Sequence, residues 1–185
     1  MAIDLYKGFT NMITGESFRC ISFDEDAFIF EWIVQPFGYI PFEHIHLEQD
    51  EIFYVKKGAL RIVIEGKEQI AGPGTSITVP KGKRHIAFND RPEVLECEVR
   101  YTPGLDNYAF FQCFGGLTVD RQMNKKGGIN IGKMLYFTGK MKARCITRPT
   151  SVPVPLFRLA IAFFLVAGSL LGWKKLYTKY TGAAR

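Results

Sequence analysis

The chain has 185 residues, of which 47% are hydrophobic and 23% are charged. This length allows one domain with an appendage, and the hydrophobic content excludes an intrinsically disordered or fibrous chain. The formal net charge of +6 is the sum of two unlike parts. Residues 1–106 hold 11 Lys and Arg against 17 Asp and Glu, whereas residues 107–185 hold 13 against one. The acidic N-terminal part is therefore excluded as a general binder of polyanions.

The N-terminal segment and the cysteines bear on the compartment. Residues 1–19, which we expect to form an N-terminal arm, lack the basic and apolar runs of a secretory signal. We therefore expect the domain to stay in the compartment where it is made. The cysteines are widely spaced and form no CxxC pair, which favours buried or incidental thiols over a zinc or redox motif. They are Cys20, Cys97, Cys113 and Cys145.

Residues 20–102 show the pattern of short β-strands. Side chains alternate in polarity or size over residues 28–34 and 95–101, and Gly, Pro and Asn separate such runs. Residues 52–55 and 60–64 flank a turn that ends at Gly58, which predicts a hairpin. Many short strands at this spacing are typical of an antiparallel sandwich or barrel. We expect this first domain to be all-β.

The strand pattern ends after residue 102. Over residues 105–116 several apolar side chains recur at helical spacing, which predicts a short helix. Residues 103–150 form a basic connector, and a further helix is expected over residues 131–143. The cations of this connector are Arg121, Lys125, Lys126, Lys133, Lys140, Lys142, Arg144 and Arg148.

Residues 151–173 form the most hydrophobic segment of the chain. Between Val152 and Trp173 the only charged residue is Arg158. A helix of this length can cross about 30 Å of hydrocarbon, so we predict a transmembrane helix followed by a basic tail over residues 174–185. A helix that docks on the protein or forms a dimer is the alternative, because the uninterrupted apolar stretch begins only at Leu159.

The three histidines are the strongest chemical signal. His44 and His46 lie two residues apart, so a strand would place both imidazoles on the same face. Glu51 follows after a short link, and His85 can return to the pair across a barrel. Three imidazoles and one carboxylate form a mixed nitrogen and oxygen site for a divalent transition metal, with positions left open. Calcium would need more oxygen ligands.

Two longer patterns contain these residues. From Gly38 to Gly58 the sequence reads G-x5-H-x-H-x4-E-x6-G, and from Gly74 to Asn89 it reads G-x5-P-x-G-x2-H-x3-N. Both resemble the two conserved motifs of the cupin superfamily, and the match holds at every motif position. The resemblance implies a cupin jelly-roll β-barrel over residues 20–102. We expect a short α-helical C-terminal extension with a hydrophobic helix to follow it.

The resemblance also implies roles for individual residues. It places His44, His46, Glu51 and His85 at the metal-ligand positions, for iron, manganese, nickel, zinc or copper. The turn and strand-end positions fall on Gly38, Gly58, Gly74, Pro80, Gly82 and Asn89. A weaker similarity links the chain to a group of small bacterial cupin-domain proteins. It rests on an N-x-x-T-G-E opening at residues 11–16, FGG at 114–116, NKKG at 124–127 and LLGW at 170–173.

Two classes of function stay open at this point. The first is a metal-dependent enzyme acting on a small organic molecule, with a dioxygenase-like oxidoreductase favoured over an isomerase. Glu51 would then serve as a general base, and Phe53 and Ala87 would line an apolar substrate pocket, although plain barrel core describes them equally well. The second is a non-catalytic ligand-binding or sensing module tethered to the membrane.

The expected partners follow from the two unlike parts. The cations of residues 107–185 lie beside an apolar helix, which favours anionic lipid over nucleic acid as the partner of this part. We therefore expect membrane association through the C-terminal helix, with the barrel on the cytoplasmic side. We expect no nucleic-acid partner. The cupin resemblance further implies a homodimer.

Overall fold

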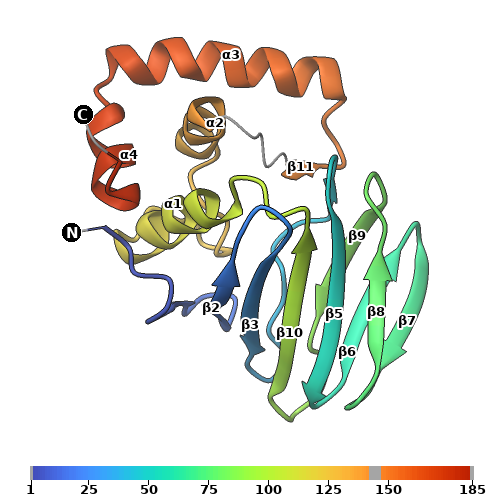
Figure 1. Ribbon diagram of the computed structural model, residues 1–185. Coiled ribbons are helices and arrows are strands. Elements are labelled where there is room, and N and C mark those ends of the chain that lie inside the picture. Colours follow the sequence, from blue (N-terminus) through green and yellow to red (C-terminus); the bar gives the residue numbers. More distant parts are fainter. Residues whose placement is uncertain (1, 142–146, 184–185) are drawn as a thin grey trace.

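The computed structural model describes residues 2–141 and 147–183. The predictions that concern Lys142, Arg144 and Cys145 therefore lie outside the described residues. Two antiparallel sheets face each other, and the helices gather at one end of them (Figure 1). The main core cluster lies between the sheets and extends to the first helix.

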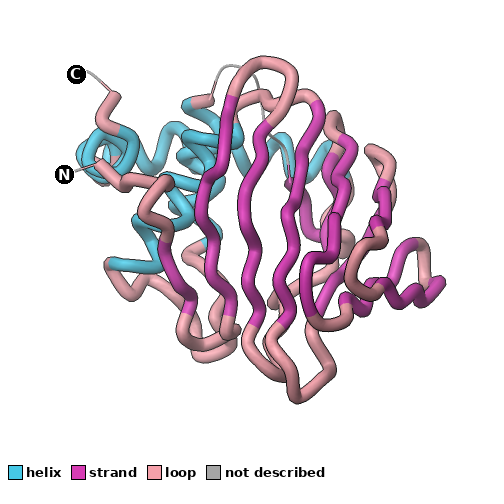
Figure 2. The backbone as a smooth tube through the Cα atoms, turned by 60° about the horizontal axis from the view of Figure 1, so that its bottom comes forward, coloured by secondary structure: helices cyan, strands magenta, loops and turns pink. Residues whose placement is uncertain are grey.

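The first sheet has six strands. Figure 2 shows long strands of this sheet side by side. In spatial order the six strands are β1 (Phe9–Asn11), β2 (Glu16–Phe23), β3 (Phe28–Val34), β10 (Leu95–Thr102), β5 (Asp50–Lys57) and β8 (Ser76–Val79). The second sheet has five strands. They are β11 (Thr147–Pro149), β4 (His44–His46), β9 (Arg84–Phe88), β6 (Leu60–Ile64) and β7 (Lys67–Ala71).

The alternation over residues 28–34 and 95–101 produces the inner face of the first sheet. Every second side chain of β3 and β10 is buried, including Trp32 and Val99, and the two strands pair along their whole length. The jelly-roll interpretation of this region is thus supported by two antiparallel sheets around one core.

The hairpin expected around Gly58 is wrong. β5 pairs with β10 and β8 in the first sheet, whereas β6 pairs with β7 and β9 in the second. The turn therefore carries the chain from one sheet to the other. Gly58 has a positive φ of 75°, and a Cβ atom there would lie 2.5 Å from the carbonyl oxygen of Val94. Only glycine fits this crossing without a shift of the backbone.

The first sheet starts earlier than residue 20. β1 and β2 form an antiparallel pair, and β2 pairs in turn with β3. The inward side chains of β2 include Glu16, Phe18 and Cys20. The segment expected as an arm thus supplies β1 and the first half of β2.

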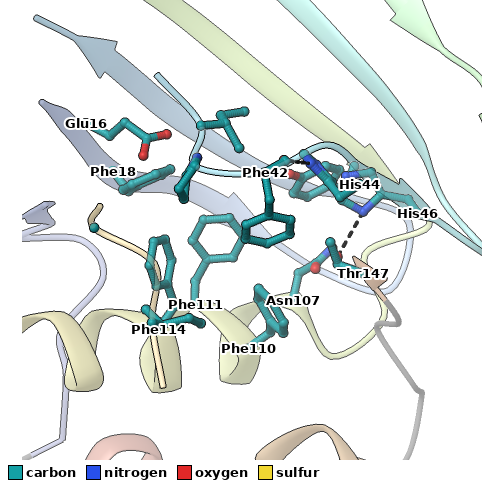
Figure 3. A pocket seen from close by; sticks show the side chains of 15 residues that line it. Glu16, Phe18, Phe42, His44, His46, Asn107, Phe110, Phe111, Phe114 and Thr147 are labelled. Carbon is teal, nitrogen blue, oxygen red and sulfur yellow. Dashed lines mark hydrogen bonds between the residues drawn. The ribbon is translucent and has the colours of Figure 1, made fainter. Parts of the chain in front are cut away.

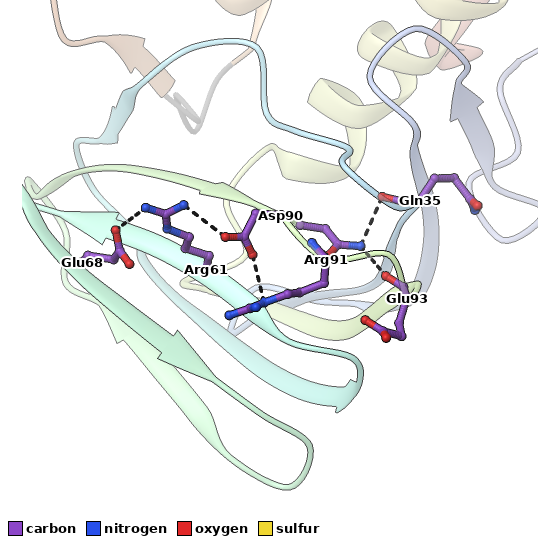
Figure 4. A network of polar contacts seen from close by, with 7 residues as sticks. Gln35, Arg61, Glu68, Asp90, Arg91 and Glu93 are labelled. Carbon is purple, nitrogen blue, oxygen red and sulfur yellow. Dashed lines mark hydrogen bonds and ion pairs between the residues drawn. The ribbon is translucent and has the colours of Figure 1, made fainter.

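The end of the second conserved motif fixes a loop. The Asn89 amide donates hydrogen bonds to the carbonyl oxygens of Val34, Gln35 and Glu93, at 3.1, 3.2 and 2.7 Å. Next to this loop, Arg61 pairs with both Glu68 and Asp90 (Figure 4). Asn89 thus ties the end of β3 to the loop before β10, which is a structural role.

The described residues also contain four helices, so the molecule as a whole is not all-β. They are α1 (Asn107–Val119), α2 (Ile131–Lys140), α3 (Val154–Leu170) and α4 (Lys174–Thr181). The helices expected near residues 105–116 and 131–143 are confirmed as α1 and α2 within the described residues. The helices bury apolar side chains against the barrel and against each other. This packing removes the hydrophobic residues outside the strands from water.

The FGG segment of α1 lets two other elements approach closely. A Cβ atom on Gly115 would lie 2.8 Å from the ring of Phe9, and one on Gly116 would lie 2.3 Å from the ring of Tyr180. Tyr180 is buried and donates a hydrogen bond of 2.7 Å to Asp120. The C-terminal helix α4 is therefore packed against α1.

The predicted membrane helix over residues 151–173 is not found as one helix. α3 ends at Leu170, and α4 continues at an angle of 97° after a short break. In the described parts of the chain no single helix is both long and apolar enough to cross a bilayer. Among the described helices, only α3 and α4 taken together, as a bent pair, have the length and composition of a membrane span.

Candidate metal centre and its cavity

The four predicted ligands lie together in one buried cluster. His44 and His46 are on β4, and the pairing of β4 with β9 places His85 directly opposite His44. Glu51 reaches them from the start of β5 in the other sheet. One ligand atom from each of the four side chains lies within 4.8 Å of the other three. All four are at least 95% buried.

Each imidazole is oriented through its Nδ1 atom. Nδ1 of His44 lies 3.2 Å from the carbonyl oxygen of Phe42, and Nδ1 of His85 lies 3.0 Å from that of Lys83. Nδ1 of His46 lies 3.0 Å from the hydroxyl of Thr147 on β11. A carbonyl partner keeps the proton on Nδ1, so Nε2 of His44 and His85 is left with a free lone pair.

Three atoms of the cluster are buried and have no hydrogen-bond partner. They are Nε2 of His46, Nε2 of His85 and Oε2 of Glu51. The distances to Glu51 Oε2 are short, 3.3 Å from His46 and 2.8 Å from His85, but the atoms are not aligned as hydrogen bonds. Unpaired buried polar atoms destabilise a fold, and a cation between them would satisfy all three. The donor set fits a divalent transition metal.

The charges of the cluster are set by its own members. Burial, together with His85 and His46, holds the pKa of His44 well below its usual value. Burial raises the pKa of Glu51, but His46 and His85 outweigh burial and hold that pKa well below its usual value. Burial lowers the pKa of His85, but Glu51 outweighs burial and raises that pKa. His44 is thus neutral and Glu51 is ionised at neutral pH.

A small cavity of about 110 Å³ opens beside the cluster. His44 and His46 form part of its wall, and most of the remaining wall is apolar and aromatic (Figure 3). The other lining residues are Glu16, Phe18, Ile40, Pro41, Phe42, Tyr101, Asn107, Phe110, Phe111, Phe114, Gly127, Ile129 and Thr147. The size is of the order of the ~150 Å³ that accommodates benzene in a protein core.

Phe53 and Ala87, expected in the substrate pocket, lie elsewhere. Both are almost completely buried in the core cluster between the sheets. Neither is among the residues that line this cavity. Strand alternation places them on the inner face, but it does not distinguish the packed core from the cavity wall. Three aromatic side chains of the wall, Phe110, Phe111 and Phe114, come instead from α1.

Sequence reasoning missed two polar residues of this region. Thr147 contacts His46 from a strand of three residues, and no sequence signal indicates such a short strand. Glu16 lines the cavity from the start of β2 and is 98% buried. Here a signal existed, because Glu16, Phe18 and Cys20 alternate with Ser17 and Arg19 and continue the strand pattern toward the N-terminus.

The comparisons with known proteins concern the barrel. Residues 30–101 match the family model of the cupin domain. No curated protein matches the chain. KdgF from Halomonas sp. is 22% identical, with 51% of this chain and 84% of that chain covered and a TM-score of 0.46. The cupin domain of Cnp3 from Schizosaccharomyces pombe is 11% identical, with 48% and 64% covered and a TM-score of 0.45.

A third solved structure is described as a sugar phosphate isomerase from a cupin superfamily, from Silicibacter pomeroyi. It is 24% identical, with 49% of this chain and 60% of that chain covered and a TM-score of 0.44. The family match over residues 30–101 includes all four side chains of the buried cluster. The barrel that holds the cluster is therefore a cupin domain.

Proposed function

We propose that this cupin domain binds a divalent transition metal through His44, His46, Glu51 and His85 and acts on a small organic molecule in the adjoining cavity. The observation that carries the proposal is the set of unpaired, buried ligand atoms that converge beside an apolar cavity. Such a site needs no further polar residue to hold the ion. Iron, manganese, nickel, zinc and copper all accept this set of donors.

We favour a dioxygenase-like oxidoreductase, with an isomerase as the next candidate. The bound metal would supply Lewis-acid or redox chemistry at the wall of the cavity. The protein would contribute three things. The Nδ1 contacts of the histidines fix their rings, the aromatic wall excludes water from an apolar ligand, and the ionised Glu51 carboxylate can accept a proton as a general base.

A non-catalytic module that binds or senses a ligand is the second candidate. The specific observation in its favour is the burial of the cluster, because His85 is completely buried and Glu51 is 97% buried. A metal held there can stabilise the barrel and complete the cavity without turnover. This candidate and the enzyme share the metal and the ligand, so they differ only in product formation.

The test uses the full chain. Elemental analysis of protein purified without added metal should find about one transition metal per chain, and His85→Ala should lose it. Iron-, manganese- and nickel-loaded protein is then assayed for oxygen uptake and product formation with a panel of flavonoids, diketones and thiols. Saturable binding without product would support the sensing module. Full activity in both Glu51→Ala and His85→Ala would contradict a metal-dependent enzyme.

We also propose that α3 attaches the protein to an anionic lipid surface, lying along it. Large apolar side chains lie exposed along the whole length of α3, with 57–85% of their surface accessible. They are Leu156, Leu159, Phe163, Val166 and Leu170. Exposed Arg158, Lys174 and Lys175 flank this face, as in helices that bind the headgroup region.

Sedimentation with vesicles tests this attachment. Wild-type protein should sediment with vesicles that contain phosphatidylglycerol, and Phe163→Glu should release it into the supernatant. Ile70→Glu, at a similarly exposed apolar residue on β7, is the matched control and should still sediment. Light scattering without lipid tests the homodimer that we expect of a cupin. A dimer that Phe163→Glu dissociates, with no vesicle binding by wild type, would assign the α3 face to a second copy.

A further inference from the structure

A second buried carboxylate, that of Glu16, lines the cavity beside the metal cluster and is not part of that cluster. Glu16 lies at the start of β2 in the first sheet, whereas His44 and His46 lie on β4 in the second. Figure 3 shows Glu16 on one side of the cavity and the two histidines on the other. The candidate metal centre does not use this residue.

The carboxylate of Glu16 is held in place by two neutral donors. The Thr14 hydroxyl donates a hydrogen bond of 2.7 Å to Oε2, and the Trp32 indole N–H donates one of 3.1 Å to Oε1. Each carboxylate oxygen has a second lone pair, so both contacts leave acceptor capacity for a further donor. In the described structure no Lys or Arg pairs with Glu16. Burial raises its pKa to about 7, although Thr14 and Trp32 act in the opposite direction.

The wall between the two polar ends is aromatic. Phe18 and Phe114 have ring centroids 5.3 Å apart, and those of Phe18 and Phe111 are 5.7 Å apart. Phe42 and Phe110 also line the cavity. A ligand that fits here has a flat apolar body, because aromatic walls make most of their contacts with such a body.

Two distant segments of the chain build the Glu16 end. The Asn11 side chain accepts a hydrogen bond of 3.2 Å from the backbone N–H of Ile13 and donates one of 3.0 Å to the carbonyl oxygen of Gly127. Gly127 has a φ of 75°, and a Cβ atom there would lie 2.5 Å from Cγ2 of Thr14. The N-x-x-T-G-E and NKKG segments thus meet at the residue that holds the Glu16 carboxylate. None of the residues in this contact belongs to the metal cluster, so metal binding does not explain the contact.

We propose that Glu16 binds the ligand at the end of the cavity opposite the metal centre, by accepting a hydrogen bond from a hydroxyl or amino group on a single aromatic ring. The proposal rests on the proposed function in one respect, because it places the other end of the ligand at the metal-binding histidines. It adds the ligand class: a small aromatic molecule that carries a hydroxyl or amine opposite its metal-directed end.

The test compares fragments of similar size on the full chain. Toluene, phenol and benzylamine are titrated at pH 8 into wild-type protein and Glu16→Gln, with and without added zinc, and binding is followed by ligand-observed NMR. Because a hydrogen bond to a charged acceptor is stronger than one to a neutral amide, Glu16→Gln should weaken the binding of phenol or benzylamine about tenfold. Toluene should bind both proteins within a factor of two. The fragment that responds distinguishes a hydroxyl from an amine.

Two further measurements keep the outcomes separate. Glu25→Gln, at an exposed carboxylate, is the matched control and should bind all fragments as wild type does. If Glu16→Gln does not fold, the wild-type protein still decides, because phenol and benzylamine that both bind more weakly than toluene contradict the proposal. An equal loss of all three fragments in a folded Glu16→Gln also contradicts it. A calorimetric titration with zinc alone tests the metal centre, so its failure is distinguished from that of the Glu16 site.

Discussion

Glu51 in the metal cluster and Glu16 in the cavity wall are similarly buried and electrostatically opposite. Glu51 is 3% exposed and Glu16 is 2% exposed. The partners of Glu51 are two imidazoles, which can carry a positive charge, and they lower its pKa. The partners of Glu16 are a hydroxyl and an indole, which are neutral, and its pKa rises to about 7. The charge of the partners therefore decides the protonation of a buried carboxyl, and burial alone does not.

This difference assigns separate tasks to the two ends. At neutral pH the Glu51 end holds a fixed negative charge, which suits a cation. The Glu16 end changes its protonation near neutral pH and faces aromatic rings, which suits the polar group of an organic ligand. Proteins commonly separate the pKa values of paired groups in this way when the groups have different roles.

Removal of the fixed charge should have the largest effect. We expect Glu51→Gln to reduce the affinity for a divalent transition metal at least about 100-fold, because a neutral amide replaces an anionic ligand. Isothermal titration calorimetry measures the affinity. Glu48→Gln, an exposed carboxylate next to β5, is the control and should bind metal as wild type does. Unchanged affinity in Glu51→Gln would contradict the assignment of Glu51 as a ligand.

The Glu16 carboxyl should destabilise the fold as the pH rises. The lowered pKa of Glu51 implies the opposite dependence for that residue. The folded chain keeps the Glu16 proton up to about pH 7, whereas the unfolded chain loses it near 4.5. The free energy of unfolding should therefore fall between these pH values and be constant with respect to this group outside them. The loss should be about 3 kcal/mol.

Glu16→Gln isolates this contribution. Denaturant unfolding of both proteins at pH 5 and pH 8 gives two changes in the free energy of unfolding, and other titrating groups contribute equally to each. Glu16→Gln should lack the fall in the free energy of unfolding that wild type shows between pH 5 and pH 8. An equal change in the two proteins would mean that Glu16 titrates at its ordinary value.

Metal binding at the other end should release a proton. The pKa of His85 is raised above its usual 6.5 by Glu51, whereas that of His44 is well below it. Because a metal binds only the neutral imidazole, the affinity should rise about tenfold per pH unit below the pKa of His85 and level off above it. Calorimetry at pH 6 in buffers of different ionisation enthalpy should find about one proton released per metal. No release would place His85 outside the ligand set.

The metal end could be predicted from the sequence and the ligand end could not. The spacing of His44, His46 and Glu51 is local, and the two glycine-rich patterns around them fix the turns that return His85. The cavity, in contrast, depends on α1 and on the contact between Asn11 and Gly127, which are separated by more than 100 residues. Periodicity identifies the faces of elements but not which distant faces meet.

The C-terminal segment shows a related limit. Its composition predicted a membrane-spanning helix, because hydropathy counts residues and not contacts. In the structure Phe157 and Gly168 of α3 are buried, and a Cβ atom on Gly168 would lie 2.5 Å from the ring of Tyr136 on α2. Gly172 has a φ of 73°, and the chain turns there so that Tyr180 packs on α1. The glycine in LLGW is the only local sign of this turn.

Substitutions of two threonines, one at each end, should have the smallest and most specific effects on the two ends. Thr14 contacts the Glu16 carboxylate, and Thr147 contacts Nδ1 of His46. Substitution by Val keeps the shape and removes the hydroxyl. Since a partner of a metal-ligating histidine fixes its ring, Thr147→Val should reduce metal affinity about tenfold and leave phenol binding to metal-free protein unchanged.

Thr14→Val should have the reverse effect. Loss of its hydroxyl removes a hydrogen bond that favours the ionised carboxylate, so the pKa of Glu16 should rise further, while metal affinity stays as in wild type. Thr78→Val, at an exposed threonine of β8, controls for the loss of a hydroxyl on a strand. If either cavity variant changes both metal affinity and the titration of Glu16, the two ends are coupled. The cavity would then act as one site and not as two.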